Sequence, residues 1–366
     1  MTSSTRLPSV AVLGLGGTIA SSAPTRDSYL EYGAPGFHIS LLVRHLQDEL
    51  DGIARTYPEQ VLATGSSSLT IENLATITLA VERALDEHDA VVVTSGSDAL
   101  EEISYWLDLT VQSDKPVIVT GSMRPFAIET ANAGDVSPVH ELVHGADGPA
   151  NLLAAVTLAA SGHTTGSGTV VVFGDVIHAA RDVVKRNSTR VDAFESPMPG
   201  PLGYLDGGMI VLHRLPSRKI GAGSARALFD LRHRDLSNSF PRVEILVSYP
   251  GGGGEAVSAY ETAGVGGIVL DGMGFGAVTT PIHEACTAAA ERGMWFVTTT
   301  RTGTGSVHNV DHWSIAGGDL VATKARLLTI LLLDSGIDLS SAHSAFREVA
   351  MPMVNVSRKP GSRKLW

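Results

Sequence analysis

Several side chains in the N-terminal part of the sequence have the types and spacing that hydrolysis by a hydroxyl group requires. They are Thr18, which follows Gly16-Gly17, the pair Ser66 and Ser67, the pair Ser97 and Asp98, and Lys185. Such chemistry needs a nucleophilic oxygen, a group that takes its proton, N–H donors for the developing oxyanion, and groups that hold the substrate. Glycines beside these hydroxyls allow backbone N–H donors to come close to a ligand.

The stretch around Thr18 has three interpretations. Gly14 and Gly16 begin a dinucleotide-binding G-x-G-x-x-G pattern, but Ile19 occupies the place of its third small residue, where helix and strand must pack closely. A plain strand-to-loop turn, whose threonine bonds only backbone, is the better interpretation of a lone Gly-Gly-Thr. In the third interpretation Thr18 is a nucleophile just outside the carboxyl end of a buried strand, where open α/β sheets place their chemistry.

Asp98 and Lys185 also have two interpretations. A buried lysine beside an aspartate and a hydroxyl could relay a proton, because desolvation lowers the pKa of a lysine. The alternative is an ordinary ion pair, and the spacing of the two residues alone favours this alternative.

Short apolar runs alternate with helical patterns through the first part of the chain. The expected strands are residues 10–13, 90–94, 116–120, 169–173 and about 209–212, and the expected helices are residues 37–50, 71–88 behind the N-cap Thr70, one from Leu100, and one that ends at Ala160. This alternation predicts a mostly parallel sheet with helices on both faces. Residues 21–36 are polar and are expected to form a mobile loop over the site.

A length of 366 residues is long for one hydrophobic core, so two domains are expected. We expect an α/β protein with a larger N-terminal domain (1–213), a linker (214–242) and a smaller C-terminal α/β domain (243–366). The expected strands of the second domain are residues 243–247, 268–270 and 295–299, and its expected helices are residues 281–292, 324–335 and 340–349.

The composition excludes some classes of partner. A formal net charge of −11 argues against binding to nucleic acid or to an anionic membrane. No segment is long and apolar enough to cross a bilayer, and the apolar run after Arg6 is interrupted by glycines and leads into the candidate site, which cleavage would remove. The single cysteine, Cys286, cannot form an internal disulfide, so we expect a cytoplasmic protein in which Cys286 fills the core.

Metal and cofactor chemistry is not expected. His283, His308 and His312 do not have the spacing of a metal motif such as H-E-x-x-H. A hydroxyl nucleophile supplies the reaction chemistry without a metal, so we expect neither a metal nor a cofactor.

Five segments, in order, resemble signatures of the bacterial L-asparaginase/glutaminase family. They are residues 16–20 (GGTIA), 92–102 (VVTSGSDALEE), 120–125 (TGSMRP), 146–152 (ADGPANL), and 179–185 (AARDVVK) continuing to Thr189 and residues 192–194 (DAF). The resemblance extends through nearly the whole chain and implies the same two-domain α/β fold. It also implies a threonine amidohydrolase whose substrate is a small-molecule amide.

The resemblance assigns expected roles to individual residues. In that family the first threonine attacks a side-chain amide and forms an acyl-enzyme, a tyrosine of the mobile loop helps to activate it, and a second hydroxyl, an aspartate and a lysine form a proton relay. The matching positions here are Thr18, Tyr29 or alternatively Tyr32, Ser97, Asp98 and Lys185. The expected substrate-binding residues are Gly17, Gly65, Ser66, Ser67, Gly96 and Ser122.

The family is built from intimate dimers, commonly paired into tetramers, with each site between the first domain of one subunit and the second domain of another. The resemblance therefore implies a homo-oligomer, either a dimer or a homotetramer made of such dimers.

Several positions depart from the family pattern. Ser95 replaces the usual histidine, Ala99 replaces a threonine, and Ser67 replaces a glutamine that faces the substrate amine. Phe275 stands where many members have a polar residue that reaches the neighbouring subunit. The interface glutamate has no evident counterpart, although Asp311 and His312 lie near its place, and residues 126–144 form a longer stretch than usual.

These departures leave the substrate open. L-asparagine is the default substrate, and a related amide whose α-amine is blocked or missing is the rival within the same class. From another class, the protein could be an inactive relative that only binds a small ligand. Retention of the complete set of Thr18, Ser97, Asp98 and Lys185 counts against that alternative, since binding alone would not need a relay.

Overall fold

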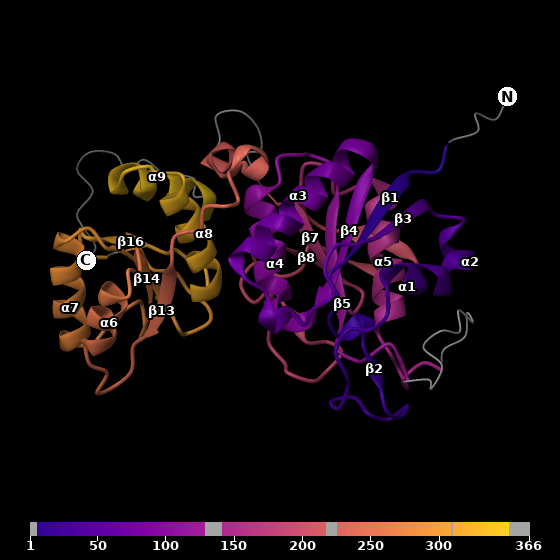
Figure 1. Cartoon of the computed structure of the whole chain (residues 1–366), viewed down its shortest axis with the longest axis horizontal. Coiled ribbons are helices and arrows are strands. Elements are labelled where there is room, and N and C mark those ends of the chain that lie inside the picture. The colour runs from indigo at the N-terminus through magenta and orange to yellow at the C-terminus, as the bar shows by residue number, and fades with distance from the viewer. Residues whose placement is uncertain (1–5, 129–140, 217–224, 309, 351–366) are drawn as a thin grey trace.

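Two large β-sheets form the framework of the computed structural model, which describes residues 6–128, 141–216, 225–308 and 310–350. The larger sheet has eight strands and the smaller one has four (Figure 1). Helices pack on both sheets, which confirms the expected α/β class. Most of the long stretch 126–144, namely residues 129–140, lies outside the described residues.

The larger sheet has the strand order β12-β11-β8-β7-β5-β4-β1-β3. Its strands are β1 (Ser9–Gly14), β3 (Arg55–Gln60), β4 (Ala90–Gly96), β5 (Val117–Ser122), β7 (Thr169–Phe173), β8 (Val176–Ala179), β11 (Gly203–Asp206) and β12 (Met209–Leu212). The strands from β3 to β7 are parallel, and the remaining neighbours are antiparallel. Every residue of β1, β4, β5 and β7 is buried, which is why these strands are continuous apolar runs.

Three strands of this sheet have no counterpart in the sequence prediction. The edge strand β3 is largely exposed and contains Pro58, and an edge position tolerates both features because one side of the strand needs no ladder partner. β8 turns directly back on β7, and β11 pairs with β8, so the sheet grows antiparallel beyond β7. These short strands lack the long apolar runs by which the parallel strands are detected.

Helices cover both faces of the larger sheet (Figure 1). α3 (Ile71–Glu87) and α4 (Leu100–Thr110) pack on one face, and α1 (Ile39–His45) and α5 (Gly148–Ser161) pack on the other. Residues 37–50 were expected to be one helix, but the helix ends near Leu46, and α2 (Gln47–Leu50) follows it.

The smaller sheet is parallel, with the order β13-β14-β15-β16. Its strands are β13 (Val243–Val247), β14 (Gly267–Gly272), β15 (Trp295–Thr300) and β16 (Ser314–Ala316), and its helices are α6 (Glu255–Thr262), α7 (Thr280–Glu291), α8 (Ala322–Asp334) and α9 (Leu339–Ala350). Cys286 on α7 is fully buried in this core, and burial raises the pKa of its thiol to about 12, so it fills the core as expected.

One hydrophobic cluster joins the two sheets. It contains residues of α3 and α4 on the first sheet together with residues of α8 and α9 on the second. The segment expected to be a polar linker contributes buried Phe229, Leu231 and Phe240 to this cluster, and the ring of Phe240 packs edge-on to Trp106 with 5.7 Å between centroids. Among the described helices, none is long and apolar enough to span a membrane.

Helix α3 begins with a reciprocal capping box. The Asn73 N–H donates to Thr70 Oγ1 at 3.2 Å, and the Thr70 N–H donates to Asn73 Oδ1 at 3.0 Å. We therefore predict that Thr70→Ala lowers the free energy of unfolding by about 1 kcal/mol, measured by urea denaturation. Thr76→Ala is the control, since Thr76 is exposed on the same helix and bonds only the Glu72 carbonyl. An equal loss in both variants would contradict the capping role.

Candidate active site

The carboxyl ends of β1 and β4 bring together two turns that carry candidate groups. In the sheet register Gly14 is paired with Thr94, so the two parallel strands end at the same edge of the sheet. A Cβ on Gly17 would lie 2.1 Å from the nitrogen of Gly96, and Gly17 has a φ of 79°. Glycine is therefore required at this contact, on which the positions of Thr18 and Ser97 depend.

Thr18 begins the short 3₁₀ helix η1 (Thr18–Ala20) directly after this contact. Thr18 is buried, with an exposed fraction of 7%, and it contacts a tyrosine of the following loop. Thr18 Oγ1 donates a hydrogen bond to Tyr32 Oη at 3.1 Å. Tyr32 is itself 40% exposed, so the buried hydroxyl is bonded to a residue that reaches the surface.

The two loop tyrosines that the sequence left as alternatives, Tyr29 and Tyr32, have different partners. The ring of Tyr29 packs under the guanidinium of Arg124, with 4.5 Å between Arg124 Cζ and the ring centroid. Tyr32 is the tyrosine that contacts Thr18. The choice between two tyrosines three residues apart depends on how the loop folds back, which the local sequence does not encode.

Lys185 joins Ser97 and Asp98 in one hydrogen-bonded group. Its Nζ donates to Ser97 Oγ at 2.9 Å and to Asp98 Oδ1 at 2.8 Å. Ser97 and Asp98 lie on η3 (Ser97–Ala99), the turn that follows β4. Ser97 is buried, and the Lys185 side chain is 16% exposed, whereas that of Asp98 is 66% exposed. The ammonium therefore links a buried hydroxyl to an accessible carboxylate.

The backbone of Lys185 is attached to the same turn-helix unit. Lys185 lies in β9 (Val184–Lys185), which pairs with β10 (Phe194–Glu195). Its N–H donates to Glu101 Oε2 at 2.7 Å. The sequence motif that contains Glu101 does not predict its contact with Lys185. The sequence feature that could have indicated this contact is the acidic pair Glu101 and Glu102, which follows Ser97 and Asp98.

A third turn brings Ser66 to the same group. Ser66 begins η2 (Ser66–Ser68) after Gly65, is buried, and its Oγ accepts a hydrogen bond from the Ala99 N–H at 3.3 Å. A Cβ on Gly96 would lie 2.6 Å from Ser66 Oγ, so Ser66 packs directly on the β4 turn. Ser67 is exposed beside it.

Ser122 does not join this group. It is fully buried at the end of β5, and its Oγ donates to the Arg124 carbonyl at 2.6 Å. The hydroxyl thus closes the turn after β5, and a role of Ser122 in substrate binding stays a prediction. Asp147 supports the same turn by accepting the N–H groups of Met123 and Arg124, each with one bond of 2.9 Å.

Comparison with known proteins gives the family. Residues 9–135 and 137–218 match the family described as "Asparaginase, N-terminal", and residues 242–346 match the "Glutaminase/Asparaginase C-terminal domain". L-asparaginase 2 of Bacillus subtilis (strain 168) is 33% identical over 348 residues, which cover 93% of this chain and 87% of the relative. This chain belongs to the asparaginase/glutaminase family.

Two further relatives agree with this membership. L-asparaginase 2 of Escherichia coli (strain K12) is 33% identical over 350 residues, which cover 93% of each chain. The crystal structure of a probable cytoplasmic L-asparaginase from Campylobacter jejuni is similar with a TM-score of 0.81 and 30% identity, covering 93% of this chain and 99% of that chain. The resemblance seen in the sequence motifs and the expected fold are confirmed.

Against this family background, the positions that depart from the usual pattern have distinct environments. Ser95 is buried within β4, and its Oγ has no hydrogen-bond partner among the described residues. Phe275 is 77% exposed. Asp311, one candidate to replace the interface glutamate, is hydrogen-bonded to His283, with 3.0 Å between Asp311 Oδ2 and His283 Nε2.

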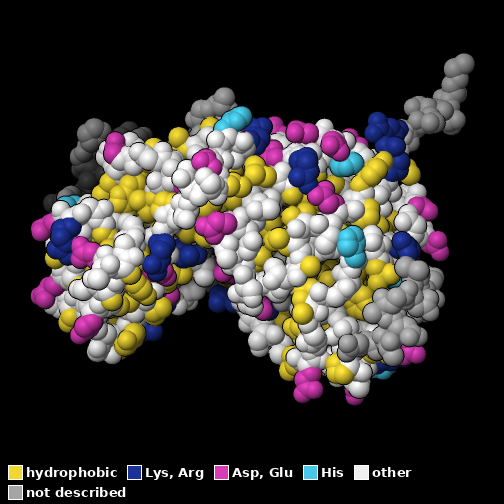
Figure 2. Space-filling model, in the orientation of Figure 1, with side chains coloured by type: hydrophobic (Ala, Val, Ile, Leu, Met, Phe, Trp, Pro, Cys, Tyr) yellow, Lys and Arg dark blue, Asp and Glu magenta, His cyan; other side chains and the backbone are white. Residues whose placement is uncertain are grey.

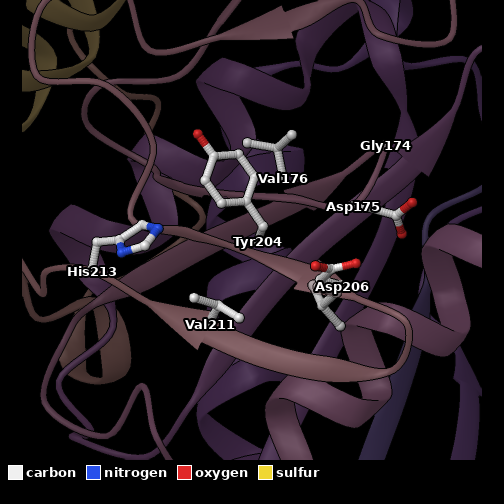
Figure 3. Close-up of a pocket in the computed structure, with 8 residues that line it drawn as sticks. Gly174, Asp175, Val176, Tyr204, Asp206, Val211 and His213 are labelled. Carbon is white, nitrogen blue, oxygen red and sulfur yellow. The ribbon is translucent and has the colours of Figure 1, made fainter.

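A surface hollow lies away from these residues. It is lined by the β7–β8 turn and by the β11–β12 hairpin, with Asp175, Tyr204, Asp206 and His213 around it (Figure 3). None of the candidate residues lines it, so it is separate from the candidate active site. Across the described ranges, no group of three or more His, Cys, Asp or Glu side chains is arranged to hold a metal ion.

The two loop tyrosines form a matched pair for mutation. We predict that Tyr32→Phe lowers the kcat of amide hydrolysis by about 100-fold or more, because it removes the acceptor of the Thr18 hydroxyl proton. Tyr29→Phe keeps the ring that packs on Arg124, so we expect it to stay close to the wild-type rate. Steady-state measurement of ammonia release checks both variants. The reverse order of losses would return the role to Tyr29.

Proposed function

We propose that this protein hydrolyses a carboxamide to a carboxylic acid and ammonia through a covalent intermediate on Thr18. By family membership the chain is an amidohydrolase of the asparaginase type. The observation that carries the finer proposal is that two hydrogen-bonded hydroxyl groups lie on turns that are in contact. Thr18 bonds Tyr32, and Ser97 bonds Lys185, on two turns that touch at Gly17 and Gly96.

In the proposed reaction Thr18 Oγ1 attacks the amide carbon, its proton passes to Tyr32 Oη, and the Tyr32 hydroxyl passes its own proton on to the amide nitrogen. The C–N bond then breaks, and the nitrogen, which now carries this proton, departs as ammonia. Water attacks the resulting ester, breaks the acyl–oxygen bond and releases the acid, which restores the Thr18 hydroxyl. Backbone N–H groups of the two glycine turns are the proposed donors for the oxyanion.

Ser97, Asp98 and Lys185 are proposed to act as a single relay. Because the ammonium bonds both the buried hydroxyl and the exposed carboxylate, a proton can move between the reacting centre and the solvent side. The simple ion pair, which the spacing alone favoured, does not explain why Lys185 also bonds Ser97. The same contacts argue against a purely ligand-binding relative, since binding alone would not need this hydroxyl on the ammonium.

The proposed substrate is an amide whose recognition depends little on an α-ammonium. Ser66 is packed against the β4 turn and can hold a carboxylate together with nearby backbone N–H groups. Ser67 is short and exposed, Phe275 is apolar, and Asp311 already bonds His283. A polar group that is buried without a hydrogen-bond partner lowers the affinity for the substrate that carries it. We therefore expect this site to bind a substrate with an α-ammonium less well than one without it.

The remaining expectations accompany this proposal. We keep the division into residues 1–213, 214–242 and 243–366, whose outer parts each contain one of the two large sheets. We also propose a homo-oligomer in which the second domain of one copy borders the site of another. Relatives described as cytoplasmic and as periplasmic both occur, so the cytoplasmic location stays a prediction from the single cysteine.

Removal of the nucleophile tests the reaction. We predict that Thr18→Ala lowers kcat by on the order of 10⁴-fold or more, since groups of a covalent mechanism commonly have effects of this size. Thr18→Ser is the matched control, because it keeps the hydroxyl and should keep measurable turnover. Ammonia release and trapping of an acyl-protein by mass spectrometry provide the two readouts. Near wild-type activity of Thr18→Ala would move the nucleophile elsewhere, with Ser97 first.

An amide panel tests the substrate. We predict that kcat/KM is lower for free L-asparagine than for at least one analogue whose α-nitrogen is absent or acylated, with L-glutamine included for comparison. If asparagine is best by a wide margin, the α-amine has partners other than those named here. If no amide is hydrolysed but one raises the melting temperature, the ligand-binding alternative is correct.

A further inference from the structure

Lys324 is a buried lysine for which the proposed reaction gives no role. It lies on α8 of the second sheet and is 1% exposed. Its Nζ donates to the carbonyl oxygens of Ala180 at 2.9 Å and of Arg181 at 3.0 Å, and also to that of Val183. An ammonium has three N–H donors, so all three are used on the turn that follows strand β8 of the larger sheet.

This turn leads directly to Lys185. It connects β8 with β9, and β9 is only two residues long and pairs with the two residues of β10. A ladder of this length holds its side chains weakly, because an isolated two-stranded pair is at best marginally stable. Other contacts must therefore fix where Lys185 points.

Further contacts hold the same turn from the second sheet's side. Arg181 bonds the Asp319 carboxylate and the Ala350 carbonyl. Glu101, which accepts the Lys185 N–H, also accepts the hydroxyl of Thr323, the neighbour of Lys324, at 3.3 Å. The backbone around Lys185 is thus held between α4 and the start of α8.

We propose that Lys324 is a positioning residue for Lys185. By gathering the carbonyls of residues 180, 181 and 183, it sets the turn so that the Lys185 ammonium reaches Ser97 and Asp98 together. The inference rests on the proposed function, because it gives Lys324 its effect through the relay. The three hydrogen bonds of Lys324 Nζ all go to main-chain carbonyls, so its effect on the relay passes through the position of Lys185.

The electrostatics of Lys324 show a cation that is shielded from water and is stabilised by its hydrogen bonds. Burial lowers the pKa of Lys324 to about 8, and the carboxylates of Glu101, Asp182 and Glu102 act against this shift, whereas Arg181 adds to it. Burying a cation is costly unless its donors are satisfied. Replacement by an apolar side chain would remove that cost but leave three carbonyls without their donor.

The first test compares two substitutions on the same helix. We predict that Lys324→Met lowers kcat by about 100-fold with little change in KM, since a displacement of about 1 Å at a reacting group can have this effect. Arg326→Met is the control: the Arg326 Nε donates to the Val243 carbonyl at 2.7 Å, on β13 and away from the Lys185 turn. It should lose stability but keep kcat. Equal kcat losses in both variants would overturn the inference.

The decisive test is a double-mutant cycle with Lys185→Met. If Lys324 acts through Lys185, Lys324→Met adds no further loss of kcat once Lys185 is absent, because groups of one unit are non-additive. Multiplicative losses would show an independent structural effect and overturn the inference. If Lys185→Met alone keeps wild-type kcat, the proposed relay fails, and the positioning role fails with it.

Lys324→Gln keeps the test available if Lys324→Met does not fold. The glutamine amide retains two N–H donors for the three carbonyls. We expect its kcat to lie below that of the wild type and its loss to vanish in the Lys185→Met background. A wild-type kcat for Lys324→Gln, with KM also unchanged, would contradict the requirement for the full set of three bonds.

Discussion

The close contact between the backbones of Gly17 and Gly96 is the constraint on which the active site depends. A Cβ at either position would overlap the neighbouring turn, so the chain can bring these strand ends together only with glycine. The contact sets Thr18 after β1 beside Ser97 after β4, and Ser66 packs against the same point. A parallel sheet supplies the two ends at one edge, and the glycines remove the side chains that would separate them.

Lys185 reaches this point from a distant part of the chain. After β7 the sheet becomes antiparallel, and the chain that leaves β8 turns toward the α4 side, where Lys185 meets Ser97 and Asp98. That turn has few backbone ladder bonds of its own. Polar contacts with α8 and with Asp319 hold this turn, so the second sheet supports a group of the first. Figure 2 shows the outer surfaces of the two parts that contain these sheets.

In the proposed function, catalysis and the choice of substrate depend on different residues. The proposed reacting hydroxyls and the aspartate lie on turns that follow β1 and β4 of the large sheet, and Lys185 lies on β9. All of them fall within the residues that match the asparaginase family. The groups that would recognise an α-amine lie on exposed positions, such as Ser67 and Phe275, which the sheet constrains little. Exposed positions can change with small effects on stability, so the same catalytic framework is compatible with different amides.

The sequence by itself determined the buried parallel strands, most of the helices, the cap of α3 and the order of the family motifs, because these depend on local patterns. Through the family resemblance it also assigned Thr18, Ser97, Asp98 and Lys185 to one predicted catalytic set, of which the structure joins the last three by hydrogen bonds. Only the tertiary structure decided that Tyr32 rather than Tyr29 contacts Thr18, that Ser122 closes its own turn, and that Glu101 and Lys324 hold the chain around Lys185. Each of these depends on where a turn folds in space or on partners up to 144 residues away, and hydrophobic periodicity carries no information about such contacts.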